Sequence, residues 1–136
     1  KFIYVKSRLY NSGDLDIKVE ESADIFFENN KKISIYLNLN FNNKKLSRKC
    51  SVYFQKGVII MDLLKEEILI FKKNSLIKKY KFKNSYKDMY INQINYFVNI
   101  IKSKKRNIKM INQSIEVMKI IDAIKKSNNL KKRVLI

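Results

Sequence analysis

Apolar and polar residues alternate along much of the first 82 residues of the chain. In the segment from Ile33 to Phe41 every second residue is apolar, and serine, tyrosine or asparagine stands between. A period of two is typical of a strand with one buried face. The same pattern predicts strands over Phe2–Leu9, Glu21–Glu28, Ile33–Phe41, Lys49–Gln55, 58–64, 67–71 and 76–82.

The connections between these strands are short and contain turn residues. The segment "NSGD" follows the first strand, and "ENNKK" follows Glu28. We expect Asn29 and Asn30 to take positive φ there, as asparagine does in tight turns. Many short hairpin connections favour an antiparallel sheet over parallel crossover units.

After residue 86 the apolar period becomes helical. One helix is predicted from the spacing of Tyr90, Ile94, Phe97, Val98 and Ile101, with Asp88 in its first turn. A second helix is predicted from Ile111 to Ile124, closed by a polar loop "KKSNNLKK" and followed by a short strand at 133–136. The predicted fold class is α+β, with one domain, one open, mainly antiparallel sheet and helices packed on one face.

Composition adds a strong positive charge but little chemistry. The net charge is +18, yet 26 of the basic residues are lysine and only 4 are arginine, the better phosphate ligand. Together with 21 isoleucines and 16 asparagines, this indicates biased codon usage more than selection for nucleic-acid binding. Without a membrane-length apolar run or a signal peptide, and with a single cysteine, we expect a cytoplasmic protein.

Several kinds of site are excluded by missing residue types. The chain has no histidine, one cysteine and two glycines. A zinc cluster, a phosphate-binding P-loop and a dinucleotide-binding glycine motif therefore cannot be built from it. We predict no catalytic, cofactor-binding or metal-binding residue in this chain.

Three weaker features have ordinary structural explanations. Acidic residues are concentrated between Asp14 and Asp24, but their spacing fits a loop and a strand face better than a calcium site. Lysines alternate with aromatics between Lys72 and Lys87, which fits a protected edge strand better than a surface for stacking bases. The alternation places Cys50 on the inward face of its strand, so we expect it to be buried and inert.

Motifs in a fixed order resemble a known family over nearly the whole chain. "EESADIFFENNKKISIYLNLNF" resembles an acidic "ED-A" motif followed by strands across a turn. "FQKGVIIMD" resembles "G-x-x-G-x-x-x-x-D", with Gly57 and Asp62 in place. "DMYINQINYFVNII" and "SIEVMKIIDAIKKSNNLKKRVLI" are similar to the closing helices and strand. The resemblance is to the C-terminal domain of the glucose–fructose oxidoreductase / inositol dehydrogenase (Gfo/Idh/MocA) family.

This resemblance implies an oxidoreductase function that would need a second, cofactor-binding domain. Residues 1–136 would form the substrate-binding and oligomerisation domain of an oxidoreductase acting on a sugar or nucleotide-activated sugar. The N-terminal Rossmann domain, which would bind NAD or NADP, is absent from this chain, and since the chain starts at Lys1 in a strand pattern we expect a fragment. The substrate-side candidates are Asp88, Tyr90 and Arg48.

Some positions depart from the family pattern. Phe54 stands where the first glycine of the turn motif is usual, and Asn38 where an aspartate is common. Gln93 and Tyr96 replace the usual glutamate and histidine of the helix motif. These departures put polar substrate contacts at the same positions in doubt.

The second face of the predicted sheet is unusually aromatic. Phe26, Tyr36 and Tyr53 each lie between inward-facing residues on what we expect to be neighbouring strands. A patch of this kind is larger than monomers usually expose, so we predict a homo-oligomer that forms through the open sheet face. Two alternatives stay open: a basic nucleic-acid-binding domain and a stand-alone subunit-interaction module.

Overall fold

The computed structural model describes residues 2–83, 86–103 and 108–136. These residues form two compact units. One comprises 1–44 and 107–136, and the other comprises 45–106. Each unit is described by itself below. Within the described residues, no helix is both long and apolar enough to cross a membrane.

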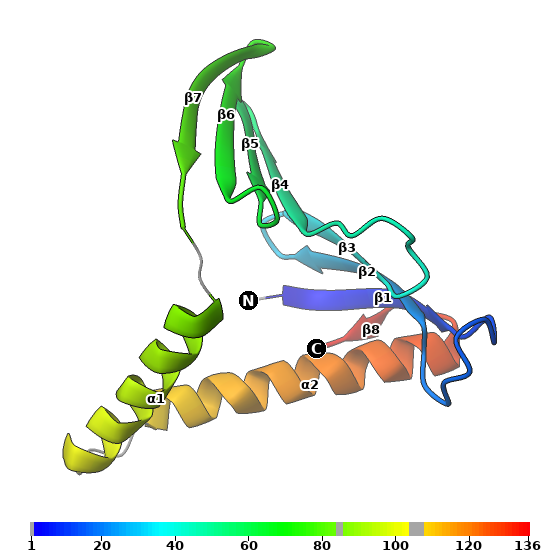
Figure 1. Ribbon diagram of the computed structural model, residues 1–136. Helices are drawn as coiled ribbons and strands as arrows, with labels where there is room; N and C mark the ends of the chain where they lie inside the picture. The colour runs from blue at the N-terminus through cyan, green and yellow to red at the C-terminus, as the bar shows by residue number, and fades with distance from the viewer. Residues whose placement is uncertain (1, 84–85, 104–107) are drawn as a thin grey trace. The chain divides into compact units, whose positions relative to one another are not determined.

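The first unit is a four-stranded antiparallel sheet with one long helix (Figure 1). The strand order is β3-β2-β1-β8. The strands run over Phe2–Tyr10 (β1), Ser22–Asn29 (β2), Ser34–Asn40 (β3) and Val134–Leu135 (β8), and the helix α2 over Ile108–Leu130.

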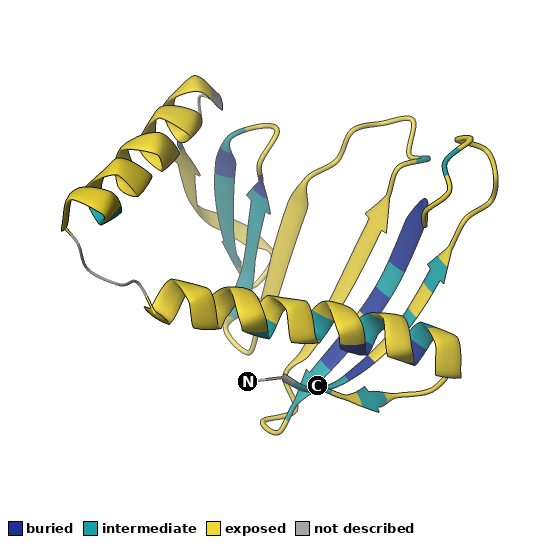
Figure 2. Ribbon diagram, turned by 90° about the horizontal axis from the view of Figure 1, so that it is seen from below, coloured by how far each residue is buried: buried dark blue, intermediate teal, exposed yellow. Residues whose placement is uncertain are grey.

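The core of this unit lies between α2 and the central strands. Val5, Ala23, Ile25 and Phe27 point from β1 and β2 toward Ala123 of α2, and all five are buried. Figure 2 shows the buried positions of the sheet beneath the helix. The alternate residues of β2, such as Asp24 and Phe26, therefore face away from α2.

The last turns of α2 are fastened to the edge of β1. β8 pairs with β1 only at Tyr4 and Val5, so the next backbone groups of β1 need other partners. The Ser7 amide donates to Ser127 Oγ at 3.1 Å, and the Leu9 amide donates to Asn128 Oδ1 at 2.8 Å. Ser127 Oγ also donates to the Lys132 carbonyl at 2.6 Å. The prediction of a polar loop from Lys125 was wrong, because tertiary hydrogen bonds hold this segment in the helix.

The Ser127→Ala variant should therefore be less stable. The methyl group of alanine leaves the part-buried Ser7 amide and the Lys132 carbonyl without their partner, which costs about 1–3 kcal/mol. Urea unfolding measures the loss. Lys126→Ala, an exposed position one residue away, is the control and should keep the midpoint of the unmutated chain. Equal midpoints for both variants would show that this hydrogen-bonded junction adds nothing to stability.

The second unit contains a four-strand meander and the helix α1. Its strands follow the chain in the order β4-β5-β6-β7, all antiparallel. They run over Lys49–Phe54 (β4), Gly57–Asp62 (β5), Glu67–Lys72 (β6) and Ser75–Lys81 (β7), and α1 runs over Tyr86–Ser103.

The α+β class and the open antiparallel arrangement are confirmed, with two differences. The strands form two four-stranded sheets instead of one. The division falls between β3 and β4, which follow one another in the chain but do not pair. The alternation in the sequence predicted the strands but did not give their partners. The prediction for Cys50 was also wrong: its thiol is exposed, since the whole of the edge strand β4 is exposed.

Candidate functional site

The predicted substrate-side residues all lie in the second unit. Asp88 and Tyr90 are in the first turns of α1, and Tyr90 is exposed. Side chains two residues apart point to different sides of a helix. Arg48 lies in the segment before β4, where its carbonyl accepts a hydrogen bond from the Leu63 amide at 2.9 Å. The three residues thus come from two separate elements, and their joint role stays a prediction.

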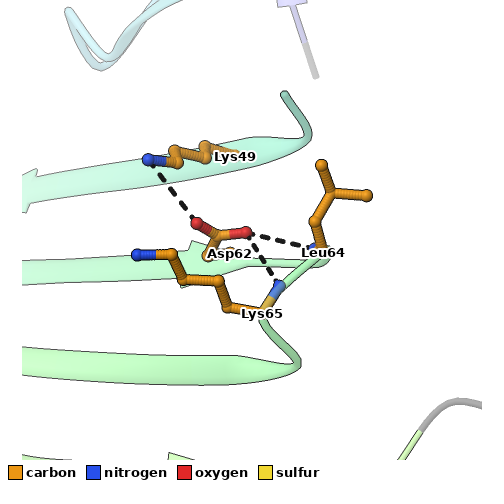
Figure 3. Close-up of polar contacts among 4 residues, drawn as sticks. All are labelled: Lys49, Asp62, Leu64 and Lys65. Carbon is orange, nitrogen blue, oxygen red and sulfur yellow. Dashed lines mark hydrogen bonds and ion pairs between the residues drawn. The ribbon is translucent and has the colours of Figure 1, made fainter. Parts of the chain in front are cut away.

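Two buried carboxylates close the hairpin between β5 and β6. Asp62 and Glu67 are directly opposite each other in the sheet, and each side chain pairs with a lysine of a neighbouring strand. Figure 3 shows Asp62 Oδ1 accepting hydrogen bonds from the Leu64 and Lys65 amides, both at 3.1 Å. Its other oxygen lies 3.5 Å from the Lys49 ammonium. The Lys79 ammonium lies 2.6 Å from the Glu67 carboxylate.

These contacts keep both acids ionised. Burial alone would raise the pKa of Asp62, but the amides of Lys65 and Leu64 and the Lys49 ammonium together hold it below its ordinary value. The hydrogen bond from Lys79 holds the pKa of Glu67 below its ordinary value, against the effect of burial. A general acid needs a raised pKa, so this pair is suited to closing the turn and pairing strands.

The acidic segment at 14–24 is organised around one buried carboxylate. Glu21 is 1% exposed. It accepts hydrogen bonds from the Ser12 amide at 2.8 Å, the Leu15 amide at 2.9 Å and Asn42 Nδ2 at 3.1 Å, and from the Ser12 hydroxyl. Among the described residues, no three acidic or cysteine side chains are grouped as a metal site. Glu21 fixes the loop that follows β1.

Folding stability should depend on the ionisation of Glu21. The Ser12 hydroxyl, with the amides of Ser12 and Leu15 and the Asn42 amide, outweighs burial and lowers the pKa from 4.5 to about 2. Because the folded pKa is depressed, the stabilisation is complete above pH 4.5 and is lost as the pH falls toward 2. Glu21→Gln should be less stable than the unmutated chain near neutral pH, and the difference should shrink in acid.

The measurement is urea unfolding over this pH range. Glu20→Gln is the matched control, because its carboxylate is exposed and adjacent in sequence. The role of Glu21 would be contradicted by parallel pH profiles for the two variants.

The face of the first sheet away from α2 carries a polar cluster beside an aromatic pair. Phe26 and Tyr36 are register partners on β2 and β3, and Tyr36 is 67% exposed. Asp24 Oδ1 accepts hydrogen bonds from the Tyr36 hydroxyl and from Asn38 Nδ2, both at 2.7 Å. These two bonds, Asn38 first, hold the pKa of Asp24 below its ordinary value, and the bond to Asp24 raises the pKa of Tyr36.

The third predicted interface residue lies elsewhere. Tyr53 is exposed on β4, in the second sheet and the second unit. Two of the three aromatics are thus neighbours, and the expectation of three on adjacent strands of one sheet was wrong. Asn38, one of the positions that depart from the pattern the sequence resembles, has a structural role here as a donor to Asp24.

Sequence reasoning did not predict that Glu21, Asp62 and Glu67 are buried, although Asp62 is part of a quoted motif. Glu21, Asp62 and Glu67 stand among other acidic residues, so their composition gives no signal of burial. A weak signal existed for Asp62, which follows an apolar strand and precedes a short turn, a common place for a side chain that accepts backbone amides. Glu21 depends on Asn42, distant in sequence, and no local pattern predicts that contact.

Comparison with known proteins finds similarity in structure only. No protein-family model matches the chain, and no curated protein matches its sequence. Among solved structures, a levoglucosan dehydrogenase in complex with NADH and levoglucosan superposes with a TM-score of 0.80 at 11% identity, over 100% of this chain and 45% of that one.

Two further structures carry nucleotide-sugar names. The WlbA dehydrogenase from Chromobacterium violaceum, in complex with NADH and UDP-GlcNAcA, gives a TM-score of 0.62 at 13% identity, over 99% of this chain and 40% of that one. The UDP-N-acetylglucosamine 3-dehydrogenase GnnA from Acidithiobacillus ferrooxidans gives a TM-score of 0.61 at 13% identity, over 77% of this chain and 33% of that one. The chain spans less than half the length of each of these three proteins. It therefore has the same fold as a part of each of these three dehydrogenases.

Proposed function

We propose that the chain is the substrate-binding and oligomerisation domain of a cytoplasmic NAD(P)-dependent oxidoreductase that acts on a sugar or nucleotide-activated sugar. The observation that carries this proposal is the match of the whole chain to part of a levoglucosan dehydrogenase, at a TM-score of 0.80. The order of motifs in the sequence supports it independently of the fold.

The cofactor would be bound by an N-terminal Rossmann domain outside this chain. With only Gly13 and Gly57, the chain has no glycine-rich turn that could hold a pyrophosphate. The neighbouring structures that contain NADH are more than twice as long as this chain, which leaves room for such a domain. NAD or NADP is thus a cofactor of the proposed whole protein.

On the substrate side we propose Asp88, Tyr90 and Arg48. A carboxylate and a phenol provide acceptors and a donor for sugar hydroxyls, and an arginine pairs with the phosphates of a nucleotide sugar. Tyr90 is exposed, so it is accessible to a ligand.

The oligomer interface would be the outer face of the first sheet around Phe26 and Tyr36. Tyr53 is a separate candidate on the second sheet. All three side chains are more than one third exposed. Large aromatics in such positions mark interfaces more often than solvated surfaces.

The proposal is tested with the product of the complete reading frame. We expect reduction of NAD or NADP with levoglucosan, UDP-N-acetylglucosamine or a related sugar. Asp88→Asn and Arg48→Gln should raise KM for that sugar, whereas Asp122→Asn, an exposed acid on α2, should leave KM unchanged. Failure of every sugar tested with both cofactors would contradict the proposed function.

The net charge favours a second candidate, a basic nucleic-acid-binding domain. A charge of +18 attracts polyanions at low salt whatever its origin. We expect such binding to be nonspecific and to fall steeply with salt, because lysines contribute phosphate contacts without base readout. Tight, sequence-selective binding at high salt would favour this candidate over the oxidoreductase.

A further inference from the structure

An open pocket lies in the first unit where β1 ends. Its walls come from the end of β1, the loop between β1 and β2, and the last turns of α2. The volume is about 400 Å³, which is within the range of small-molecule sites. The lining residues that matter here are Leu9, Lys18, Val19, Glu20, Lys125 and Asn129.

The walls of this pocket are held in place by side-chain hydrogen bonds to the backbone. Asn11 Nδ2 donates to the carbonyls of Ile17 at 2.7 Å and Val19 at 2.6 Å, and its Oδ1 accepts from the Gly13 amide at 2.7 Å. The buried Glu21 fixes the same loop from its other side. The α2 wall is fixed through Asn128 and the Leu9 amide. A ligand would therefore meet a pocket whose backbone is already ordered.

Three polar side chains that line the pocket are free to bind a ligand. Within the part of the chain that the structure describes, the side chains of Lys18, Lys125 and Asn129 have no hydrogen-bond or ion-pair partner. Two ammonium groups can pair with one acidic group, while the amide of Asn129 and the carboxylate of Glu20 can bind hydroxyls. Leu9 and Val19 add apolar surface for the C–H side of a ring.

We infer that this pocket binds an acidic sugar, that is, a monosaccharide carrying one carboxylate or phosphate. Bare phosphate fits less well, because it has no ring to contact Leu9 and Val19 and no hydroxyls for Asn129 and Glu20. A neutral sugar would leave both ammonium groups unpaired. The inference does not depend on the proposed oxidoreductase function, since its readout is binding by this chain alone.

The experiment is titration of the chain with glucuronate, a glucose phosphate, glucose and inorganic phosphate, at constant ionic strength, followed by amide NMR shifts. We expect one or both acidic sugars to bind and to shift amides of the loop after β1 and of the end of α2. Lys18→Gln and Lys125→Gln should each weaken this binding about tenfold, the loss of one charge-assisted hydrogen bond. Lys126→Gln, exposed and outside the pocket, should bind as the unmutated chain does.

Three results would overturn the inference. The first is no binding of either acidic sugar. The second is equal weakening by Lys126→Gln, which would indicate attraction to the overall positive charge. The third is binding of inorganic phosphate as tight as that of the acidic sugars, which would remove any role for the sugar ring. As a folding control, the amide spectra of the three lysine variants without ligand should match the spectrum of the unmutated chain.

Discussion

Gly57→Ala should strongly destabilise the second unit. A Cβ atom at this position would lie 2.1 Å from the Phe71 carbonyl oxygen and 3.3 Å from its carbonyl carbon. The first separation is far below van der Waals contact, and the atom concerned belongs to the backbone. It cannot move aside without disturbing the pairing of Val58 with Phe71 between β5 and β6. Overpacking of this kind costs about 1–3 kcal/mol and in some cases more.

Urea unfolding followed by circular dichroism measures this loss, and hydrogen exchange of the β5 and β6 amides locates it. The control is Lys56→Ala, an exposed substitution in the same turn that should change stability by less than about 0.5 kcal/mol. If Gly57→Ala unfolds at the same urea concentration as this control, the close contact between Gly57 and the Phe71 carbonyl would be contradicted.

The double variant Phe26→Lys with Tyr36→Lys should shift the protein from oligomer to monomer. The two side chains are register partners on the face of the first sheet away from α2. Aromatic residues at the centre of an interface commonly contribute more than 2 kcal/mol each, so the dissociation constant should rise by more than a hundredfold. Two added ammonium groups on each copy also repel one another across a symmetric contact. Folding should change little, because both positions are exposed.

Light scattering over a range of protein concentrations gives the mass of each variant. Tyr36→Phe is the matched control: it removes the hydrogen bond to Asp24 but keeps the ring, so it should stay associated. Tyr53→Lys, placed in the other unit, tests the second sheet separately. A monomeric unmutated chain at high concentration would contradict the interface, as would a double variant of unchanged mass.

Local patterns were sufficient to predict the elements. Alternation between Ile33 and Phe41 gave β3 to within a residue at each end, and the helical spacing after residue 86 gave α1. Turn details were less predictable. Lys32 takes the positive φ of 57° in the β2–β3 turn, instead of Asn29 or Asn30. Asn29 stabilises the turn through its side chain, which accepts hydrogen bonds from the Lys31 and Ile33 amides.

Features that depend on distant partners could not be read from the sequence. The end of α2 resembles a loop in the sequence because "KKSNN" is polar. In the structure Ser127 is 1% exposed, and its hydroxyl accepts a hydrogen bond from the amide of Ser7 in β1, which is 120 residues away in the sequence. Glu21 looks like one of several exposed acids until Asn42 is placed beside it. For the same reason, the division of the strands between two sheets was not predictable. Alternation determines which face of a strand a residue occupies, but not which strand lies next to it.

The candidate site was predicted mainly through the family resemblance. Asp88 and Tyr90 lie in a motif of that resemblance, whereas Arg48 lies outside the quoted motifs, and the role of all three stays a prediction. Phe26 and Tyr36, by contrast, followed from alternation alone, and their pairing across β2 and β3 agrees with it. The pocket beside α2 had no sequence signal, because Lys18 and Lys125 come from segments that only the fold brings together.

Titration with NADH tests the central claim most directly, that this chain is one domain of an oxidoreductase whose cofactor site lies elsewhere in the protein. We expect no binding of NADH by residues 1–136 in calorimetry at moderate salt, because no glycine-rich turn is present. The product of the complete reading frame should bind NADH or NADPH at about micromolar concentrations. Micromolar binding by the 136-residue chain itself, or none by the complete product, would contradict the account.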